Sequence, residues 1–141
     1  MDLKTIFMIE DEALLCDLFA EYVETIDGLD FLGYEQDGAS GIKKALELKP
    51  NIIVLDIRLP EVNGIEVLTL LRRRLPDTKV IIFTGTLNEE TLRLATRHGA
   101  HAFVEKSHGL EELKHGIEAI VRGEKFFSEG VTEIIKRFDT A

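Results

Sequence analysis

The chain has 141 residues, of which 45% are hydrophobic, as expected of one globular domain with a short tail. Lysine and arginine total 17 against 26 aspartates and glutamates, and the resulting net charge of −9 argues against direct binding to nucleic-acid phosphates. No apolar stretch approaches the ~18 residues of a membrane span, and the N-terminal residues lack the basic flank of a secretion signal, so we expect a cytoplasmic protein without membrane contact.

Short apolar runs mark the predicted strands. In chain order the strands lie at residues 6–9, 31–35, 52–55, 80–83 and 102–104, and the second is the weakest. The runs at 6–9, 52–55 and 80–83 are too short for helices and lack the alternation of half-exposed strands, a pattern typical of strands buried on both faces. We therefore predict five strands.

Segments with helical spacing of apolar residues separate and follow these strands. They cover residues 15–26, 42–48, 65–71, 89–98 and 110–122. Strict alternation of strand and helix implies a parallel sheet with helices on both faces. The predicted fold class is therefore α/β.

The pattern changes after Gly123, where a further stretch of helical spacing lies outside the five repeating units. Its apolar residues are Val131, Ile134, Ile135 and Phe138. We therefore divide the chain into a domain over residues 1–124 and a linker or tail over 125–141 with a short amphipathic helix. The apolar stripe of this helix needs a partner, which is the body of the domain, a second copy or a further domain.

Polar residues that could carry chemistry follow four of the predicted strands. They are Glu10, Asp11 and Glu12 after the first strand, Asp56 after the third, Thr84 after the fourth and Lys106 after the fifth. Because the carboxyl ends of parallel strands gather at one edge of a sheet, where such folds place their ligand sites, we expect these side chains to lie together. Crowded carboxylates need a raised pKa or a bound cation. Oxygen ligands from Glu10, Asp11 and Asp56 favour magnesium over zinc.

The same set of residues predicts that Asp56 is a nucleophile toward a phosphoryl group. That reaction needs positioning and charge neutralisation more than covalent assistance, and the cation and Lys106 would supply the positive charge. The hydroxyl of Thr84 could hydrogen-bond to a phosphoryl oxygen and draw its loop inward. Glu12 is interpreted as no more than an acidic residue in the first turn of a helix, stabilised by the helix dipole.

A family resemblance rests on the residues Glu10, Asp11, Asp56, Thr84 and Lys106, with Pro60 and Gly64 in the loop after Asp56. Over about residues 4–122 the chain resembles the CheY-like receiver domain of two-component response regulators. The resemblance implies a flavodoxin-like (βα)5 three-layer sandwich with strand order 2-1-3-4-5, and a phosphoryl donor that is a sensor histidine kinase. It also implies direct magnesium ligation by Asp11, Asp56 and the backbone carbonyl of Arg58, with Glu10 acting largely through water.

The resemblance further implies how the signal would leave the site. Phe103 lies three residues before Lys106, where the family keeps an aromatic side chain whose inward rotation accompanies the movement of the threonine. The face made of the fourth helix, fifth strand and fifth helix, about residues 88–122, would then change shape for partners. Such a protein is not an enzyme, since it only accepts the phosphoryl group and slowly loses it.

The stretches 106–108 and 122–128 look like the NarL/FixJ class, also called LuxR-type. In that class a linker and a helix-turn-helix DNA-binding domain follow the receiver. No such domain lies in this sequence, so we expect either a receiver cut within the linker or a free-standing receiver, and any contact with DNA only through the missing domain. A homodimer through the fourth-helix face or the tail stays open.

Two positions depart from the usual receiver pattern. Ser107 follows Lys106 where most receivers have a proline whose cis peptide helps to place the ammonium, and a cis bond before another residue costs about 2.5–4 kcal/mol. Lys106 is therefore expected to lack that constraint.

Gly85 follows Thr84 where alanine is frequent, and without a side chain it leaves more room beside the phosphoryl group. We therefore expect readier access for water or small donors.

Three rival functions share part of this pattern. A phosphatase of the haloacid dehalogenase type also has an aspartate nucleophile and magnesium, but its general acid is a second aspartate where this chain has Arg58. A flavodoxin binds the flavin phosphate after the first strand, where Glu10, Asp11 and Glu12 would repel it. A pseudo-receiver is an interaction module that never accepts phosphate, and the complete site argues against it. The alternative to a transcriptional regulator is therefore a free-standing receiver or a pseudo-receiver that acts as a protein-interaction module.

Overall fold

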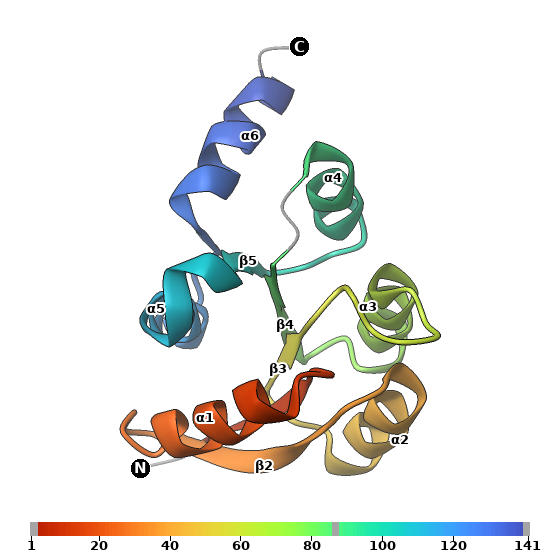
Figure 1. Cartoon of the computed structure of the whole chain (residues 1–141), viewed down its shortest axis with the longest axis vertical. Coiled ribbons are helices and arrows are strands. Elements are labelled where there is room, and N and C mark those ends of the chain that lie inside the picture. The colour runs from red at the N-terminus through yellow and green to blue at the C-terminus, as the bar shows by residue number, and fades with distance from the viewer. Residues whose placement is uncertain (1–2, 86–87, 140–141) are drawn as a thin grey trace.

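The computed structural model describes residues 3–85 and 88–139, and one sheet runs through this part of the chain (Figure 1). Its strands are β1 (Lys4–Ile9), β2 (Leu29–Glu35), β3 (Ile52–Leu55), β4 (Lys79–Thr84), β5 (Ala102–Glu105) and β6 (Phe126–Phe127). They lie in the order β2-β1-β3-β4-β5-β6, and every neighbouring pair is parallel. The predicted flavodoxin-like fold with strand order 2-1-3-4-5 is confirmed.

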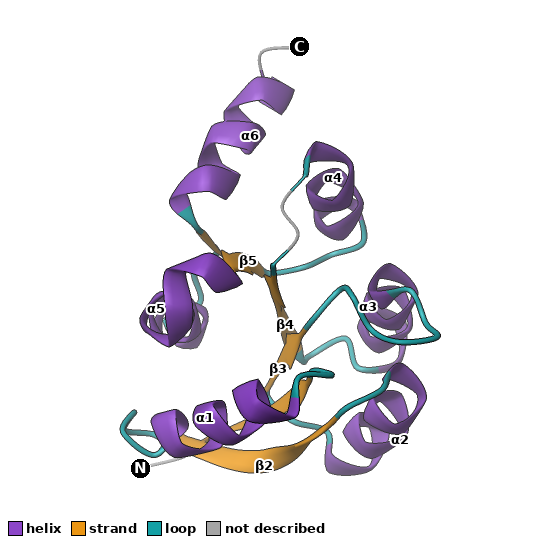
Figure 2. Ribbon diagram, viewed as in Figure 1, coloured by secondary structure: helices purple, strands orange, loops and turns teal. Residues whose placement is uncertain are grey.

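Helices cover both faces of the sheet (Figure 2). They are α1 (Ala13–Val23), α2 (Gly38–Leu48), α3 (Gly64–Arg74), α4 (Glu89–Arg97), α5 (Gly109–Val121) and α6 (Glu129–Asp139), with a 3-10 turn at Lys106–His108. Buried residues of α1 and α5 share one core cluster, and those of α2, α3, α4 and α6 share the other. Within the described residues every helix is too short or too polar to cross a bilayer.

Alternating residues of the central strands supply the two cores. Phe7 and Ile9 of β1 face the α2, α3 and α4 side, whereas Ile6 and Met8 face the α1 and α5 side. All four side chains are fully buried. A strand buried on both faces needs apolar residues at every position, which explains the uninterrupted apolar runs in the sequence.

A tight turn after β3 shapes the loop that carries Asp56. The N–H of Gly64 donates to the carbonyl of Ile57 at 3.0 Å, and a Cβ atom at this glycine would overlap the Ile57 backbone. Asn63 then caps α3, since its side-chain oxygen accepts a hydrogen bond from the N–H of Ile65 at 2.8 Å. The loop is thus held against the start of α3 by backbone contacts that only glycine permits.

The C-terminal segment extends the sheet and packs on the core. Phe126 and Phe127 form β6, which pairs with β5 and which the sequence analysis did not predict. In α6, Val131 is 0% exposed and Ile134 is 9% exposed, and both join the core cluster on the α4 side. For Val131 and Ile134 the partner of the apolar stripe is therefore the body of the domain, whereas the side chains of Ile135 and Phe138 lie outside the described part of the chain. The division of the chain between residues 124 and 125 stays a prediction.

Packing of α6 predicts that Val131→Ala destabilises the protein. Removing two buried methyl groups should lower the free energy of unfolding by about 1–3 kcal/mol. The matched control is Glu133→Ala on the same helix, whose exposed side chain should matter by no more than about 0.5 kcal/mol. Urea denaturation followed by circular dichroism measures both, and equal effects of the two substitutions would mean that α6 is not docked in solution.

Candidate functional site

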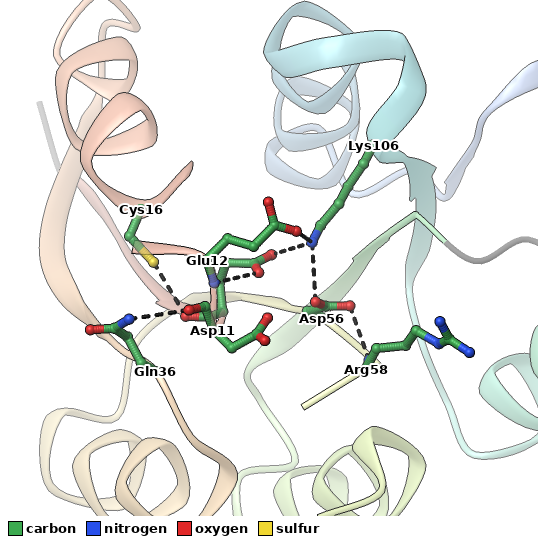
Figure 3. Close-up of polar contacts among 8 residues, drawn as sticks. Asp11, Glu12, Cys16, Gln36, Asp56, Arg58 and Lys106 are labelled. Atoms are coloured by element: carbon green, nitrogen blue, oxygen red, sulfur yellow. Dashed lines mark hydrogen bonds and ion pairs between the residues drawn. The ribbon is translucent and has the colours of Figure 1, made fainter. Parts of the chain in front are cut away.

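The carboxyl ends of four neighbouring strands converge on one edge of the sheet (Figure 3). Glu10 directly follows β1, Asp56 directly follows β3 and Lys106 directly follows β5. Thr84 is the last residue of β4. The parallel order of these strands therefore brings together residues that are far apart in the sequence.

A single ammonium group joins the acidic side chains at this edge. Lys106 Nζ lies 3.1 Å from Asp56 Oδ2 and 2.9 Å from Glu10 Oε1. It also donates a hydrogen bond to Glu12 Oε1 at 2.9 Å (Figure 3). None of the described residues has a cis peptide bond, so the peptide bond between Lys106 and Ser107 is trans. The side chain of Lys106 contacts Asp56 with this bond in the trans form.

The acidic residues form a set that suits a hard cation. Glu10, Asp11 and Asp56 each offer one carboxylate oxygen, and these oxygens lie within 4.8 Å of one another. Glu10 is 1% exposed and Asp56 is 3% exposed, so water screens their repulsion poorly. The close polar contact of Glu10 Oε1 among the described residues is the ion pair with Lys106 Nζ, at 2.9 Å. A buried carboxylate oxygen that lies among other carboxylate oxygens fits a magnesium site.

Arg58 contributes its backbone to the site. Its N–H donates to Asp56 Oδ1 at 3.0 Å, which orients the carboxylate (Figure 3). A cleft of about 340 Å³ opens beside this pair. The residues that line it are Asp11, Glu12, Asp56, Arg58, Gly85 and Lys106. A small anion could therefore reach Asp56 from solvent.

Among the described residues, those that line this cleft do not include Thr84 or Phe103. Both side chains are buried, and Phe103 belongs to the core cluster on the α4 side of the sheet. The roles predicted for these two residues stay predictions.

Burial and charge set the protonation of the site. Burial raises the pKa of the Glu10 carboxyl to about 7; the Lys106 ammonium opposes this shift and the negative charge of Asp56 adds to it. Burial alone would lower the pKa of Lys106, but its contacts with the carboxylates outweigh burial and raise that pKa. Lys106 is therefore a permanent cation at neutral pH.

The structure shows two contacts at the site that the sequence analysis did not predict. Glu12 was interpreted as a helix-start residue, yet it makes no side-chain cap hydrogen bond to α1 and instead pairs with Lys106. Gln36 donates through Nε2 to the backbone carbonyl of Asp11 at 3.1 Å (Figure 3). Both contacts join segments far apart in the chain, so no local sequence pattern could have shown them.

The chain is similar to known proteins over most of its length. The family model described as the response regulator receiver domain matches residues 6–118. A protein-glutamate methylesterase/protein-glutamine glutaminase from Thermotoga maritima is 34% identical over 107 residues, covering 74% of this chain and 30% of that protein. The nitrate/nitrite response regulator protein NarL from Escherichia coli is 28% identical over 131 residues, covering 93% of this chain and 61% of that protein.

Among solved structures, a LuxR-family two-component response regulator from an Aurantimonas species superimposes with a TM-score of 0.91. The likeness covers 99% of this chain and 100% of that one at 24% sequence identity, and it supports the fold. The chain spans between 30% and 61% of the length of the two curated relatives described above.

The burial of Glu10 predicts a pH-dependent stability of the metal-free protein. Its pKa is about 7 in the folded protein against an ordinary value of 4.5, so the folded protein holds the proton more tightly than the unfolded chain. The stabilisation is complete below pH 4.5 and is lost as the pH rises through 7.

Glu10→Gln cannot ionise and serves as the reference. As the pH rises from 4.5 to about 7, the free energy of unfolding of the wild type should fall relative to that of the variant by up to about 3 kcal/mol. Urea denaturation in the presence of a chelator gives this difference at each pH. A difference that does not change with pH would show that Glu10 titrates normally.

Proposed function

This chain belongs to the family of response regulator receiver domains, and we propose from that membership that it takes a phosphoryl group on Asp56 from a sensor histidine kinase. The observation that carries the proposal is the position of the Asp56 carboxylate. It lies at a solvent-open cleft, 3.1 Å from the ammonium of Lys106 and within 4.8 Å of two further carboxylates that suit a magnesium ion.

In the proposed reaction a carboxylate oxygen of Asp56 attacks the phosphorus of a phosphohistidine. The new oxygen–phosphorus bond forms as the phosphorus–nitrogen bond breaks, and the electron pair leaves with the imidazole, which takes up a proton. The N–H of Arg58 holds the carboxylate in place, and Lys106 supplies a positive charge to the transferred group. A magnesium ion held by Asp11, Asp56 and the Arg58 carbonyl, with Glu10 through water, would neutralise further phosphoryl oxygens.

The proposed output runs through β5 and the surface around it, about residues 88–122. Phe103 lies in β5, three residues before Lys106, and is the proposed switch together with Thr84. The carbonyl of Phe103 accepts a hydrogen bond from the N–H of Ser128 at 3.1 Å, and the Ser128 hydroxyl accepts one from Glu105 at 3.1 Å. Movement of β5 would therefore reach the segment that leads into α6.

The consequence of this switch is proposed to be control of transcription. In the LuxR-type class a helix-turn-helix domain after the receiver binds DNA, and the curated relatives extend well beyond the region that matches this chain. Contact with DNA would come from such a domain outside this sequence, and two copies of the chain could pair to present it. A free-standing receiver or pseudo-receiver that acts as an interaction module is the alternative.

An esterase or phosphatase activity has less support. Only 30% of the Thermotoga methylesterase is covered, so its activity does not transfer to this chain. The residue two positions after Asp56 is Arg58, which cannot serve as the general acid of a dehalogenase-type phosphatase. We therefore propose acceptance and slow loss of one phosphoryl group without turnover of external substrates.

The proposal predicts one phosphoryl adduct on Asp56. Incubation with magnesium and acetyl phosphate should add a single phosphoryl group by intact mass, and a chelator should prevent it. Asp56→Asn should give no adduct, because an amide is not a nucleophile toward phosphorus. Asp77→Asn, a change at an exposed aspartate remote from the site, should behave as the wild type. Hydrolysis of the donor without any adduct would instead favour a phosphatase.

The absence of a side chain at Gly85 predicts that the phosphoryl group on Asp56 is short-lived. It lines the cleft and leaves space beside Asp56, so water should reach the phosphoryl group readily. In Gly85→Ala the new methyl group would meet only the Lys106 side chain, at an ordinary contact distance of 3.9 Å, so the variant should fold normally. Loss of the adduct, followed by intact mass after the donor is removed, should be several-fold slower in the variant. An unchanged rate would eliminate this explanation.

A further inference from the structure

Lys106 has more acidic partners than its proposed task requires. Its ammonium has three N–H groups and contacts three carboxylates, those of Glu10, Glu12 and Asp56. Two of these carboxylates are almost fully buried, whereas the Glu12 side chain is 60% exposed. The ammonium is therefore surrounded by three carboxylates, and a phosphoryl oxygen has to compete with them for it.

We propose that Glu12 is a positioning residue that holds Lys106 in a waiting position and thereby slows phosphoryl acceptance. The inference rests on the proposed function, because it concerns the same reaction at Asp56. Glu12 has no part in the proposed metal site. It acts only through the lysine, to which it is bound at 2.9 Å.

Exposure decides which carboxylate Lys106 releases. Glu10 and Asp56 are buried, so loss of the ammonium would leave either charge without water to replace it. Glu12 lies at the mouth of the cleft, where water can hydrate its carboxylate as soon as the lysine moves. The Glu12 contact is therefore the one that an incoming phosphoryl group would replace, and breaking it adds to the barrier of the reaction.

The helix does not need the Glu12 carboxylate. Glu12 precedes α1, and its side chain makes no cap hydrogen bond. The contact that it makes with the helix is through its backbone carbonyl, which accepts a hydrogen bond from the N–H of Cys16 at 3.0 Å. Substitution by glutamine keeps this backbone contact and the length of the side chain, and removes only the charge.

The test compares Glu12→Gln and Glu12→Ala with the wild type. Adduct formation is followed by intact mass at saturating magnesium over a range of acetyl phosphate concentrations, since the chain has no tryptophan to report the reaction. An exposed ion pair contributes little, so the maximal rate should rise about 1.5- to 5-fold in both variants. Glu21→Gln removes the same charge from an exposed position farther along α1, and its maximal rate should equal that of the wild type.

Simple repulsion of the negatively charged donor gives a different result. It would lower only the donor concentration needed for half the maximal rate, and the effect would disappear at high salt. That result, an equal rise in Glu21→Gln, or an unchanged or lower maximal rate in the Glu12 variants would overturn the inference. If the wild type forms no adduct, the proposed function itself fails, so the two failures can be told apart.

Discussion

The balance of charge at the carboxyl-terminal edge of the sheet is the constraint on which the site depends. The parallel strand order brings Glu10 and Asp56 to the same edge, where both are buried and water cannot separate their charges. One ammonium, that of Lys106, contacts both carboxylates. Four acidic side chains, those of Glu10, Asp11, Glu12 and Asp56, lie at this edge with that one ammonium, and burial raises the pKa of Glu10 to about 7. The remaining negative charge is what favours a second cation among these oxygens.

The same balance makes the site sensitive to a new charge. A phosphoryl group on Asp56 would add negative charge next to Lys106, the residue that directly follows β5. β5 also holds the C-terminal segment, through its pairing with β6 and its hydrogen bonds with Ser128. Val131 of α6 packs in the same core cluster as Phe103 of β5. The acidic edge and the C-terminal helix are therefore attached to the same short strand.

Much of the site could be predicted because its residues lie at or just after the ends of strands, and each of these strands is recognisable from its own apolar run. Asp56 comes directly after an apolar run that suits a strand buried on both faces, and the parallel order then places it beside the end of β1. Glu12 was misinterpreted because its partner is 94 positions away, and an acidic residue before a helix has an ordinary local explanation. β6 was missed because two residues are too few for a pattern, and the strand exists only through its pairing with β5.

The spacing of apolar residues is a local property of the chain, so strands β1 to β5, the helices and the chemical groups at the strand ends could be predicted from it. Three features emerged only in the folded molecule: Lys106 is shared among three carboxylates, Thr84 and Phe103 are buried, and α6 packs on the body of the domain. These features depend on distances and burial between segments remote in the chain. The strength of a charge–charge contact depends on distances of a few ångströms and on access to water. The spacing of residues within one segment specifies neither of these for a partner in another segment.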